Sequence, residues 1–282
     1  MAAPLPCGGA ALLLLDMPRY FFTCAYDGAA YLGWQSQRGG GTLQDCIEEA
    51  CAAVLHTPLR IHAAGRTDAG VHARAQCFHA DVPESCRMSA DNWLAALNAH
   101  LPGDIRIVRA EAVPNDWHAR FSACGKIYDY LICCEPVLSP FLRARAWHCP
   151  RGIGDRELLR AALHEYIGTH DFRRFAARRG NEPAVPPPDF YRRTLRRAEL
   201  SEETGMLRLR FCGDGFMYRM VRMLVGSAVQ VSLGKMRVET LREMLQQPEG
   251  PKTRFCAPAA GLYLHAVLYP ELPHPAQGGA GR

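Results

Sequence analysis

Ala64-Gly65-Arg66-Thr67-Asp68-Ala69-Gly70-Val71-His72 is a short polar stretch between two apolar segments. These segments, at residues 61–64 and 75–80, have the composition of short β-strands, so the stretch is expected to form the loop that joins them. Its one carboxylate, Asp68, is flanked by glycines and follows Arg66 by two positions. A carboxylate on a short turn held by strands is rigidly aimed, as a nucleophile requires.

The residues around this turn alternate between strand and helix patterns. Alternating apolar and aromatic residues predict strands, and apolar residues spaced three and four apart predict helices. We expect strands at 19–26, 61–64, 75–80 and 104–113, and helices that begin after Thr42 and Ser89. This order, strand, helix, strand, strand, helix, strand, indicates an α+β unit with its helices packed on one side of a sheet.

A second unit is expected to begin near residue 114. The patterns predict strands at 124–134, around 207–211 and at 262–269, and helices from Asp155 to Ile167, at 215–234 and at 238–246. The helix at 215–234 is apolar almost all round, which is typical of a buried helix. Arg219 and Arg222 are expected on one side of it, and an arginine there needs a partner, for which Asp68 is a candidate.

The chain therefore divides into four expected segments. These are a flexible leader at 1–18, an N-terminal α+β lobe at 19–113 that carries Asp68, a C-terminal α+β lobe at 114–270, and a disordered tail at 271–282. The tail is rich in proline and glycine, and chain ends of that kind seldom pack.

The composition is that of a soluble globular protein. The chain has 282 residues, of which 48% are hydrophobic and 22% charged, and its formal net charge is +5. The positive charge is concentrated, because residues 171–197 hold eight arginines against three acids. Prolines within residues 178–189 predict an exposed loop there. A basic concentration of this kind attracts polyanions, and we interpret its arginines as contacts to phosphate groups.

Twelve cysteines are scattered along the chain with no CxxC motif, so we expect reduced thiols. His72, Cys77 and His79 could suggest a metal site. The last two alternate with other residues as in a strand, however, and no second ligand pair follows at zinc spacing. We therefore expect no metal at these residues.

The apolar patch at residues 10–15 is too short to span a membrane, for which about 20 residues are needed. It also lacks the basic region of a secretory signal, and no arginine-rich transit peptide is visible. We expect an intracellular protein with no membrane contact, in the mitochondria or in the cytoplasm and nucleus, with the mitochondria slightly preferred.

The turn at 64–72 resembles the signature of the TruA-type tRNA pseudouridine synthases. Six further blocks match the same family in the same order and extend the resemblance over about residues 19–270. They lie at residues 26–35, 98–105, 118–123, 126–130, 220–226 and 260–264. The stretch at 178–189 looks longer than the corresponding family loop, so no RNA contact is carried over to it.

The resemblance implies cofactor-free isomerisation of uridine to pseudouridine in RNA, most often tRNA. Asp68 then corresponds to the nucleophile, and Arg66 to the arginine that helps to evert the target nucleotide. Tyr128 corresponds to the tyrosine that stacks on the flipped uracil, and Arg222 to the basic residue paired with the aspartate. These residue types suit the task, because aromatic stacking and a guanidinium offset the cost of unstacking a base.

The resemblance also implies an architecture. It consists of two RRM-like lobes that share a mixed, mainly antiparallel sheet, with helices on one side and a central RNA cleft. Family members are commonly homodimers in which one RNA contacts both subunits.

Other functions would use some of the same residues. A catalytically silent RNA-binding protein of the same fold would share the basic segments, but Asp68, Arg66, Tyr128 and Arg222 are all present here. A carboxylate-based glycosidase would need a second acid near the first. A purely structural Asp68 would cap local backbone amides or pair with Arg66.

Overall fold

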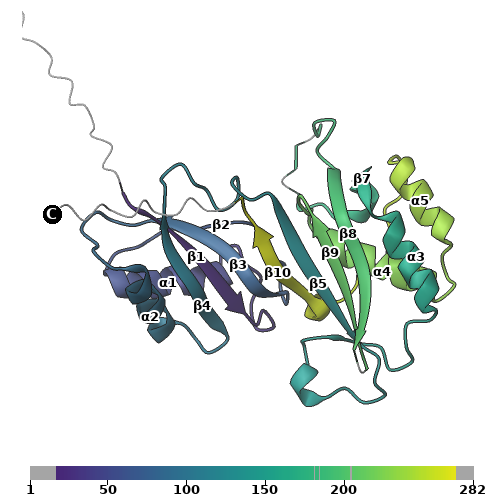
Figure 1. Cartoon of the computed structure of the whole chain (residues 1–282), viewed down its shortest axis with the longest axis horizontal. Coiled ribbons are helices and arrows are strands. Elements are labelled where there is room, and N and C mark those ends of the chain that lie inside the picture. The colour runs from purple at the N-terminus through teal and green to yellow at the C-terminus, as the bar shows by residue number, and fades with distance from the viewer. Residues whose placement is uncertain (1–16, 181, 184, 204, 271–282) are drawn as a thin grey trace, which may run out of the picture.

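The computed structural model describes residues 17–180, 182–183, 185–203 and 205–270. The expected tail at 271–282 lies outside the described residues, and so does the expected leader except for its last two residues. The described chain forms five α-helices and a ten-stranded mixed sheet (Figure 1), which confirms the α+β class. No helix in this part of the chain is long and apolar enough to cross a membrane.

The N-terminal half of the sheet and its two helices follow the predicted order. The elements are β1 (Arg19–Tyr26), α1 (Leu43–Leu55), β2 (His62–Ala63), β3 (His72–Asp81), α2 (Ala90–His100) and β4 (Ile105–Val113). Both helices begin after the predicted caps. The Thr42 hydroxyl accepts from the backbone N–H of Asp45, and the Asp45 carboxylate bonds back to Thr42, so two backbone donors are satisfied at the start of α1.

The C-terminal half contains more strands than the sequence predicts. Its elements are β5 (Gly125–Cys133), β6 (Trp147–His148), α3 (Arg156–Glu165), β7 (Gly168–Asp171), β8 (Arg192–Glu203), β9 (Met206–Gly213), α4 (Met220–Ser232), α5 (Val238–Gln246) and β10 (Leu262–Leu268). The short strands β6 and β7 and the longer β8 were not predicted. In β8 only Leu195 and Ala198 are buried, so the strand lacks the alternation that would have revealed it.

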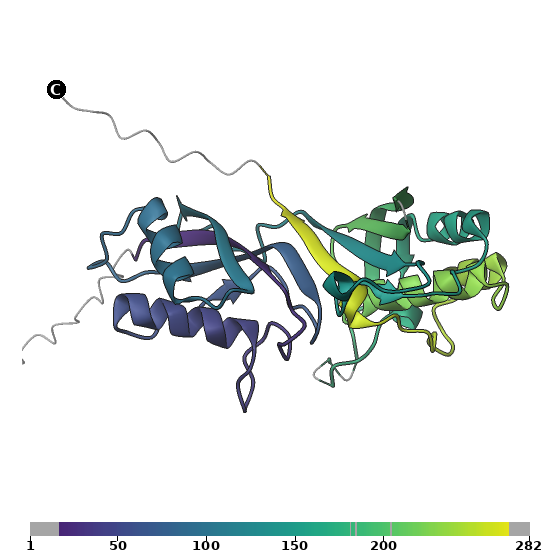
Figure 2. The same cartoon turned by 90° about the horizontal axis from the view of Figure 1, so that it is seen from below.

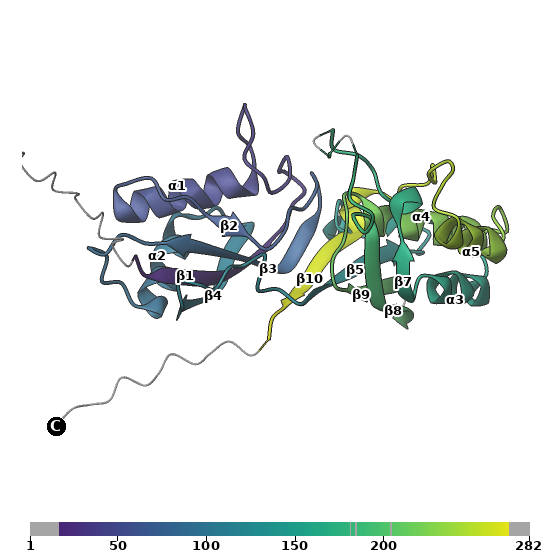
Figure 3. The same cartoon turned by 90° about the horizontal axis from the view of Figure 1, so that it is seen from above.

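One sheet runs through the whole described chain, in the order β4-β1-β3-β10-β5-β9-β8-β7. The strand β10 lies in its middle, parallel to β3 and antiparallel to β5. Figures 1 to 3 show α1 and α2 beside the half that contains β1, β3 and β4, and α3 to α5 beside the half that contains β7, β8 and β9. The last strand of the described part of the chain therefore joins segments that lie far apart in sequence.

The helix α4 begins later than the sequence predicts. It starts at Met220 rather than near Gly215, because Arg219 takes a left-handed backbone conformation with φ of 58°. Arg219 is consequently exposed at the helix entrance, where its guanidinium lies 5.0 Å from the ring centroid of Tyr218. The prediction that Arg219 and Arg222 share one side of a helix was wrong.

The cysteines in the described part of the chain are free, in agreement with the prediction of reduced thiols. Buried examples such as Cys24 and Cys51 pack among the core side chains of the N-terminal half. A buried thiol of this kind behaves as a small hydrophobic group.

Candidate active site

The turn between β2 and β3 is fixed by hydrogen bonds to the strands and to a neighbouring loop. The buried Thr67 accepts at its carbonyl from the Trp34 backbone N–H, at 3.1 Å, and its hydroxyl bonds the Tyr26 hydroxyl at 2.8 Å. The Gln76 amide donates to the carbonyl oxygen of Gly65 at 2.8 Å. The residue before Asp68 is thus held on both its backbone and its side chain.

Two glycines allow that neighbouring loop to approach the turn. A Cβ at Gly28 would lie 1.9 Å from the Val71 carbonyl oxygen, and a Cβ at Gly33 would lie 2.8 Å from the Thr67 carbonyl oxygen. Neither position can carry a side chain unless the backbone moves. The strand β3 also begins at His72, three residues before its predicted start, so the free turn is shorter than expected.

The carboxylate of Asp68 faces Arg222 from α4, 154 positions away in the sequence. The Arg222 Nη1 lies 3.3 Å from the Asp68 Oδ2, and the side chains of Arg222 and Asp68 are 15% and 14% exposed. The Arg222 Nε donates to the carbonyl oxygen of Ala257 at 2.8 Å, which orients the guanidinium. Within the described residues, the bond from Arg222 is the one hydrogen bond that the Asp68 carboxylate accepts. The carboxylate therefore neither caps local backbone amides nor pairs with Arg66.

Tyr128 and Arg66 lie in the same cleft as Asp68. Tyr128 is buried on β5, with its ring edge-on to Phe216 at a centroid distance of 5.0 Å. Burial raises the pKa of its phenol, and the nearby charge of Asp68 raises that pKa further. Arg66 is exposed, and its pKa is lowered by partial burial and by the charges of Arg179 and Arg120. Three of the four predicted site residues therefore line one cleft, and the fourth, Arg222, contacts Asp68 there.

The cleft has a volume of about 860 Å³ and is lined by residues from both halves of the protein. Its basic lining residues outnumber its acidic ones. The basic residues are Arg60, Arg66, Arg120, Lys126, Arg179, Arg193 and Arg219, and the acidic ones are Asp68 and Glu182. An excess of positive charge of this kind attracts a polyanion, and it surrounds the Asp68 carboxylate with cationic groups.

Loops from both halves border the cleft. In Figures 2 and 3 the loop before α1 and the loop before β8 extend on the same side of the molecule as α1. Gln35 and Ser36 of the first loop and Arg179 of the second line the cleft. The Arg179 guanidinium lies 4.6 Å from the Tyr218 ring centroid, and its backbone N–H donates to Glu182 at 2.6 Å. The first contact attaches the second loop to Tyr218 in the cleft lining, and the second closes a turn within the loop.

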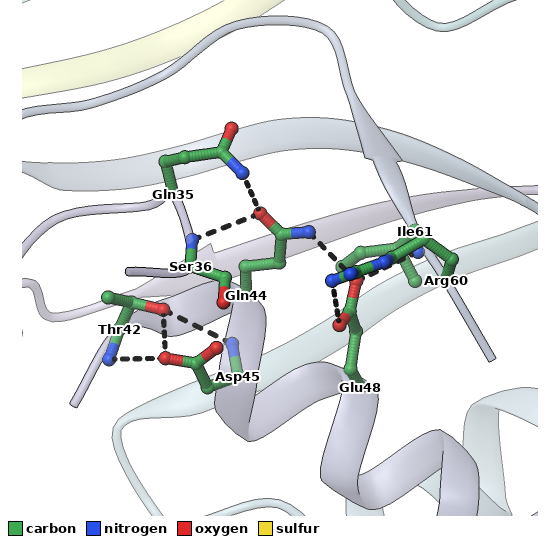
Figure 4. A network of polar contacts seen from close by, with 8 residues as sticks. All are labelled: Gln35, Ser36, Thr42, Gln44, Asp45, Glu48, Arg60 and Ile61. Carbon is green, nitrogen blue, oxygen red and sulfur yellow. Dashed lines mark hydrogen bonds and ion pairs between the residues drawn. The ribbon is translucent and has the colours of Figure 1, made fainter. Parts of the chain in front are cut away.

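A polar network makes one wall of the cleft rigid (Figure 4). The buried Gln44, at the start of α1, accepts at Oε1 from the Gln35 side chain and from the Ser36 backbone, and donates to Glu48. Glu48 in turn accepts from the guanidinium of Arg60 at 3.1 Å. A loop, a helix and the approach to β2 are thus connected, and Arg60 remains largely exposed at the cleft.

Sequence reasoning assigned no role to Lys126, although it lines the cleft. Its Nζ donates to the Ala64 carbonyl oxygen at 3.0 Å, at the start of the turn that carries Asp68. Among the described residues no carboxylate lies within ion-pair distance of it. Burial lowers the pKa of Lys126 to about 8, and the charges of Arg120 and Arg193 act in the same direction. The available signal was its position two residues before Tyr128, which puts both on one face of the strand.

Lys126 is expected to make the stability of the protein pH-dependent. Its pKa is about 8 in the folded chain and 10.5 in the unfolded chain, so between these values the unfolded chain binds more protons and stability rises with pH. We expect the wild type to gain free energy of unfolding relative to Lys126→Met as the pH rises from 7.5 to 9.5, measured by urea denaturation. A difference that does not change with pH would contradict this expectation, and Lys235→Met, on an exposed lysine, is the control.

These features define a class of protein, an α+β protein with a basic cleft around one arginine-paired carboxylate. The family model described as tRNA pseudouridine synthase matches residues 23–122 and 162–270. The chain belongs to this family.

Individual relatives match over nearly their whole length. The tRNA pseudouridine synthase A of Akkermansia muciniphila is 48% identical over 256 residues, which are 90% of this chain and 96% of that protein. Proteins of the same name from Beijerinckia indica and Methylacidiphilum infernorum are 40% and 37% identical. Those alignments cover 90% and 89% of this chain, and 95% of each relative.

Proposed function

We propose that this chain converts uridine to pseudouridine in tRNA, with the carboxylate of Asp68 as the nucleophile. The isomerase activity and the tRNA substrate follow from membership of the family and from the relatives described above. The role of Asp68 is supported by one observation above all: it lines a basic cleft and is paired there with Arg222 of α4. This arrangement offers one aimed carboxylate to a bound nucleotide.

The isomerisation breaks the glycosidic bond from C1′ to N1 and forms a bond from C1′ to C5. The hydrogen on C5 is lost, N1 gains a proton, and no oxidant or reductant is required. In the proposed mechanism Asp68 attacks either the ribose or the uracil, and the free base turns before it rejoins the sugar. Arg222, 3.3 Å away, keeps the carboxylate in place during this exchange.

The remaining site residues have proposed roles in reaching and holding the base. Arg66 is exposed at the cleft, where it can replace the stacking contacts that the uridine loses when it leaves the RNA. Tyr128 would stack on the everted uracil. Arg179, whose guanidinium lies against the Tyr218 ring in the cleft lining, would contact phosphate.

Substitution of Tyr128 tests both the function and the stacking role. Tyr128→Leu should lower turnover about tenfold to hundredfold because it removes the aromatic face, whereas Tyr128→Phe should keep most of the activity. Turnover is measured as release of tritium from tRNA transcribed with uridine tritiated at C5, because that hydrogen is lost in the product. Equal activity of the two variants, with equal thermal stability, would reject the stacking role.

The same assay separates the enzyme from a catalytically silent RNA-binding protein of this fold. The enzyme releases tritium, and digestion of the RNA followed by mass spectrometry with a pseudouridine standard detects the product. A protein that binds the transcript but releases no tritium from any tRNA of its source cell would support the silent alternative.

The two-lobe architecture belongs to the same proposal. The elements of the first half run β1, α1, β2, β3, α2, β4, and their order across the sheet is β4, β1, β3, β2. In the second half, β5, α3, β8, β9, α4 and β10 repeat this succession, and the order across the sheet is β10, β5, β9, β8. The agreement supports two RRM-like lobes, at 19–113 and 114–270, with a central RNA cleft and with helices on one side of the shared sheet.

An assembly and a location complete the proposal. A homodimer in which one RNA contacts both subunits rests on the family resemblance, and sedimentation of the protein with and without tRNA tests it. An intracellular site of action, with the mitochondria preferred, is tested by fractionation of the source cells.

A further inference from the structure

The loop between β4 and β5 presents a large aromatic ring to solvent inside the cleft. Phe121 is 78% exposed, yet it lines the cleft together with His118 and Arg120. The His118 ring lies 4.4 Å from the Phe121 ring, and the Arg120 guanidinium lies 5.8 Å from its centroid. We call these three residues the aromatic shelf. The proposed mechanism gives them no role.

The shelf is held in place by its own backbone. The His118 Nδ1 accepts from the backbone N–H groups of Arg120 and Phe121, at 3.0 and 3.4 Å. Ser122 closes the turn, because its hydroxyl accepts from the His118 N–H at 2.9 Å and its own N–H donates to the His118 carbonyl oxygen at 2.9 Å. Partial burial and the charges of His62, Arg19 and Arg120 lower the pKa of His118, which keeps Nδ1 available as an acceptor at neutral pH.

The same loop is attached to the sheet from below. Ala119 is fully buried, its N–H donates to the Nδ1 of His79 at 3.2 Å, and its carbonyl oxygen accepts from the Tyr269 hydroxyl at 2.7 Å. The exposure of Phe121 is therefore a fixed feature of the fold, not a result of a loose loop. A rigid, exposed aromatic ring is suited to a partner that covers it.

The surroundings of the ring indicate which partner this is. Arg66, Arg120 and Lys126 line the same cleft, so an anionic partner is favoured over an apolar protein segment. Single-stranded nucleic acid combines phosphate charge with a flat base, and it is bound by basic grooves that carry aromatic stacking surfaces. The cleft volume of about 860 Å³ is near the upper end of the range for drug-sized ligands, which leaves room beyond one nucleoside.

We propose that the aromatic shelf stacks an unpaired base of the tRNA that lies next to the everted uridine, and so forms a second nucleotide site in the cleft. This inference rests on the proposed function for the identity of the RNA. The shelf would act in binding and not in bond exchange. Stacking is tolerant of base identity, because every base has a flat aromatic face.

The test compares Phe121→Leu, which removes the aromatic face, with Phe121→Trp, which restores one. Phe141→Leu is the matched control, since Phe141 is 82% exposed but lies on a turn outside the cleft lining. The probe is a tRNA transcript whose pseudouridine site has been mapped. Each nucleotide that flanks this site is replaced in turn by 2-aminopurine, whose fluorescence falls when it stacks.

We expect Phe121→Leu to raise the Kd and KM for the transcript about fivefold to hundredfold, with kcat at saturating RNA changed less than twofold. One flanking 2-aminopurine should be quenched by the wild type and by Phe121→Trp, and not by Phe121→Leu. Phe141→Leu should behave as the wild type.

Three results would overturn the inference. The first is an unchanged Kd for Phe121→Leu, and the second is an absence of quenching at every flanking position. The third is a change in the oligomeric state seen by sedimentation with no change in RNA affinity, which would mean that a second copy of the chain covers the ring. The proposed function fails separately, if the wild type binds the transcript but makes no pseudouridine in it.

Discussion

Replacement of Asp68 by alanine is expected to abolish pseudouridine formation while tRNA binding and folding remain. The carboxylate contributes one ion pair to the fold, with Arg222 at 3.3 Å, and both groups are partly exposed to solvent. Its removal leaves Arg222 without its anionic partner, so we expect a loss of about 1–3 kcal/mol, less than for a fully buried pair, with the chain still folded. Loss of the proposed nucleophile removes the covalent route itself, so we expect tritium release from labelled tRNA to fall by more than about 10⁴-fold.

The control for this variant is Asp116→Ala, on an exposed carboxylate in the loop between β4 and β5 that does not line the cleft. It should bind and turn over tRNA as the wild type does. If Asp68→Ala bound tRNA normally and kept more than about a tenth of the wild-type turnover, Asp68 would have only a structural role.

Replacement of Arg222 by methionine should have the second largest effect. Methionine keeps much of the side-chain volume and removes the guanidinium that holds Asp68 and donates to the Ala257 carbonyl oxygen. We expect kcat to fall about 10²- to 10³-fold, as when one electrostatic group is removed from an active site. The free energy of unfolding should fall by about 1–3 kcal/mol, less than for a fully buried pair because both side chains retain some solvent contact.

A double-mutant cycle separates the pair from the other contacts of Arg222. Asp68→Asn, Arg222→Met and their combination are compared by urea denaturation. If the two side chains interact, the double variant should be more stable than the sum of the single losses predicts, by about 0.5–3 kcal/mol. Strict additivity would mean that the pair contributes nothing to stability, and that Arg222 acts through Ala257.

The turn at 64–72 could be predicted because its signals are local. Glycines and polar residues between two apolar segments indicate a loop, and the structure has it between β2 and β3. The caps at Thr42 and Ser89 were equally visible, since a capping side chain bonds a backbone group only three residues away. Elements specified by their nearest neighbours were therefore placed correctly.

The rest depended on contacts that a linear sequence does not contain. Residues 192–203 look like a charged surface segment, yet they form β8 because their backbone pairs with β9 and β7. Arg219 falls in an apolar run that suggests a helix, but its left-handed backbone places it outside α4. An apolar pattern predicts which residues are buried, and it does not predict where the backbone turns.

The candidate site was predictable only in part for the same reason. An arginine on an apolar helix indicates a buried acidic partner, and this argument pointed from Arg222 to Asp68 across 154 positions. The roles of Arg66 and Tyr128 were assigned only through the resemblance to a family. The same resemblance included Phe121 in the block at 118–123 but gave it no role, and only the structure shows its ring exposed in the cleft.

The central claim is that an oxygen of the Asp68 carboxylate forms the bond that starts the reaction. Asp68→Asn tests it most directly, because asparagine keeps the shape of the side chain and removes its charge and nucleophilicity. With enzyme in excess over a tRNA transcript, so that binding is complete, pseudouridine is quantified by mass spectrometry after a single turnover. We predict complete conversion by the wild type and no product from Asp68→Asn over the same period and for 10³ times longer. Formation of pseudouridine by Asp68→Asn at a rate within about tenfold of the wild type would contradict the claim.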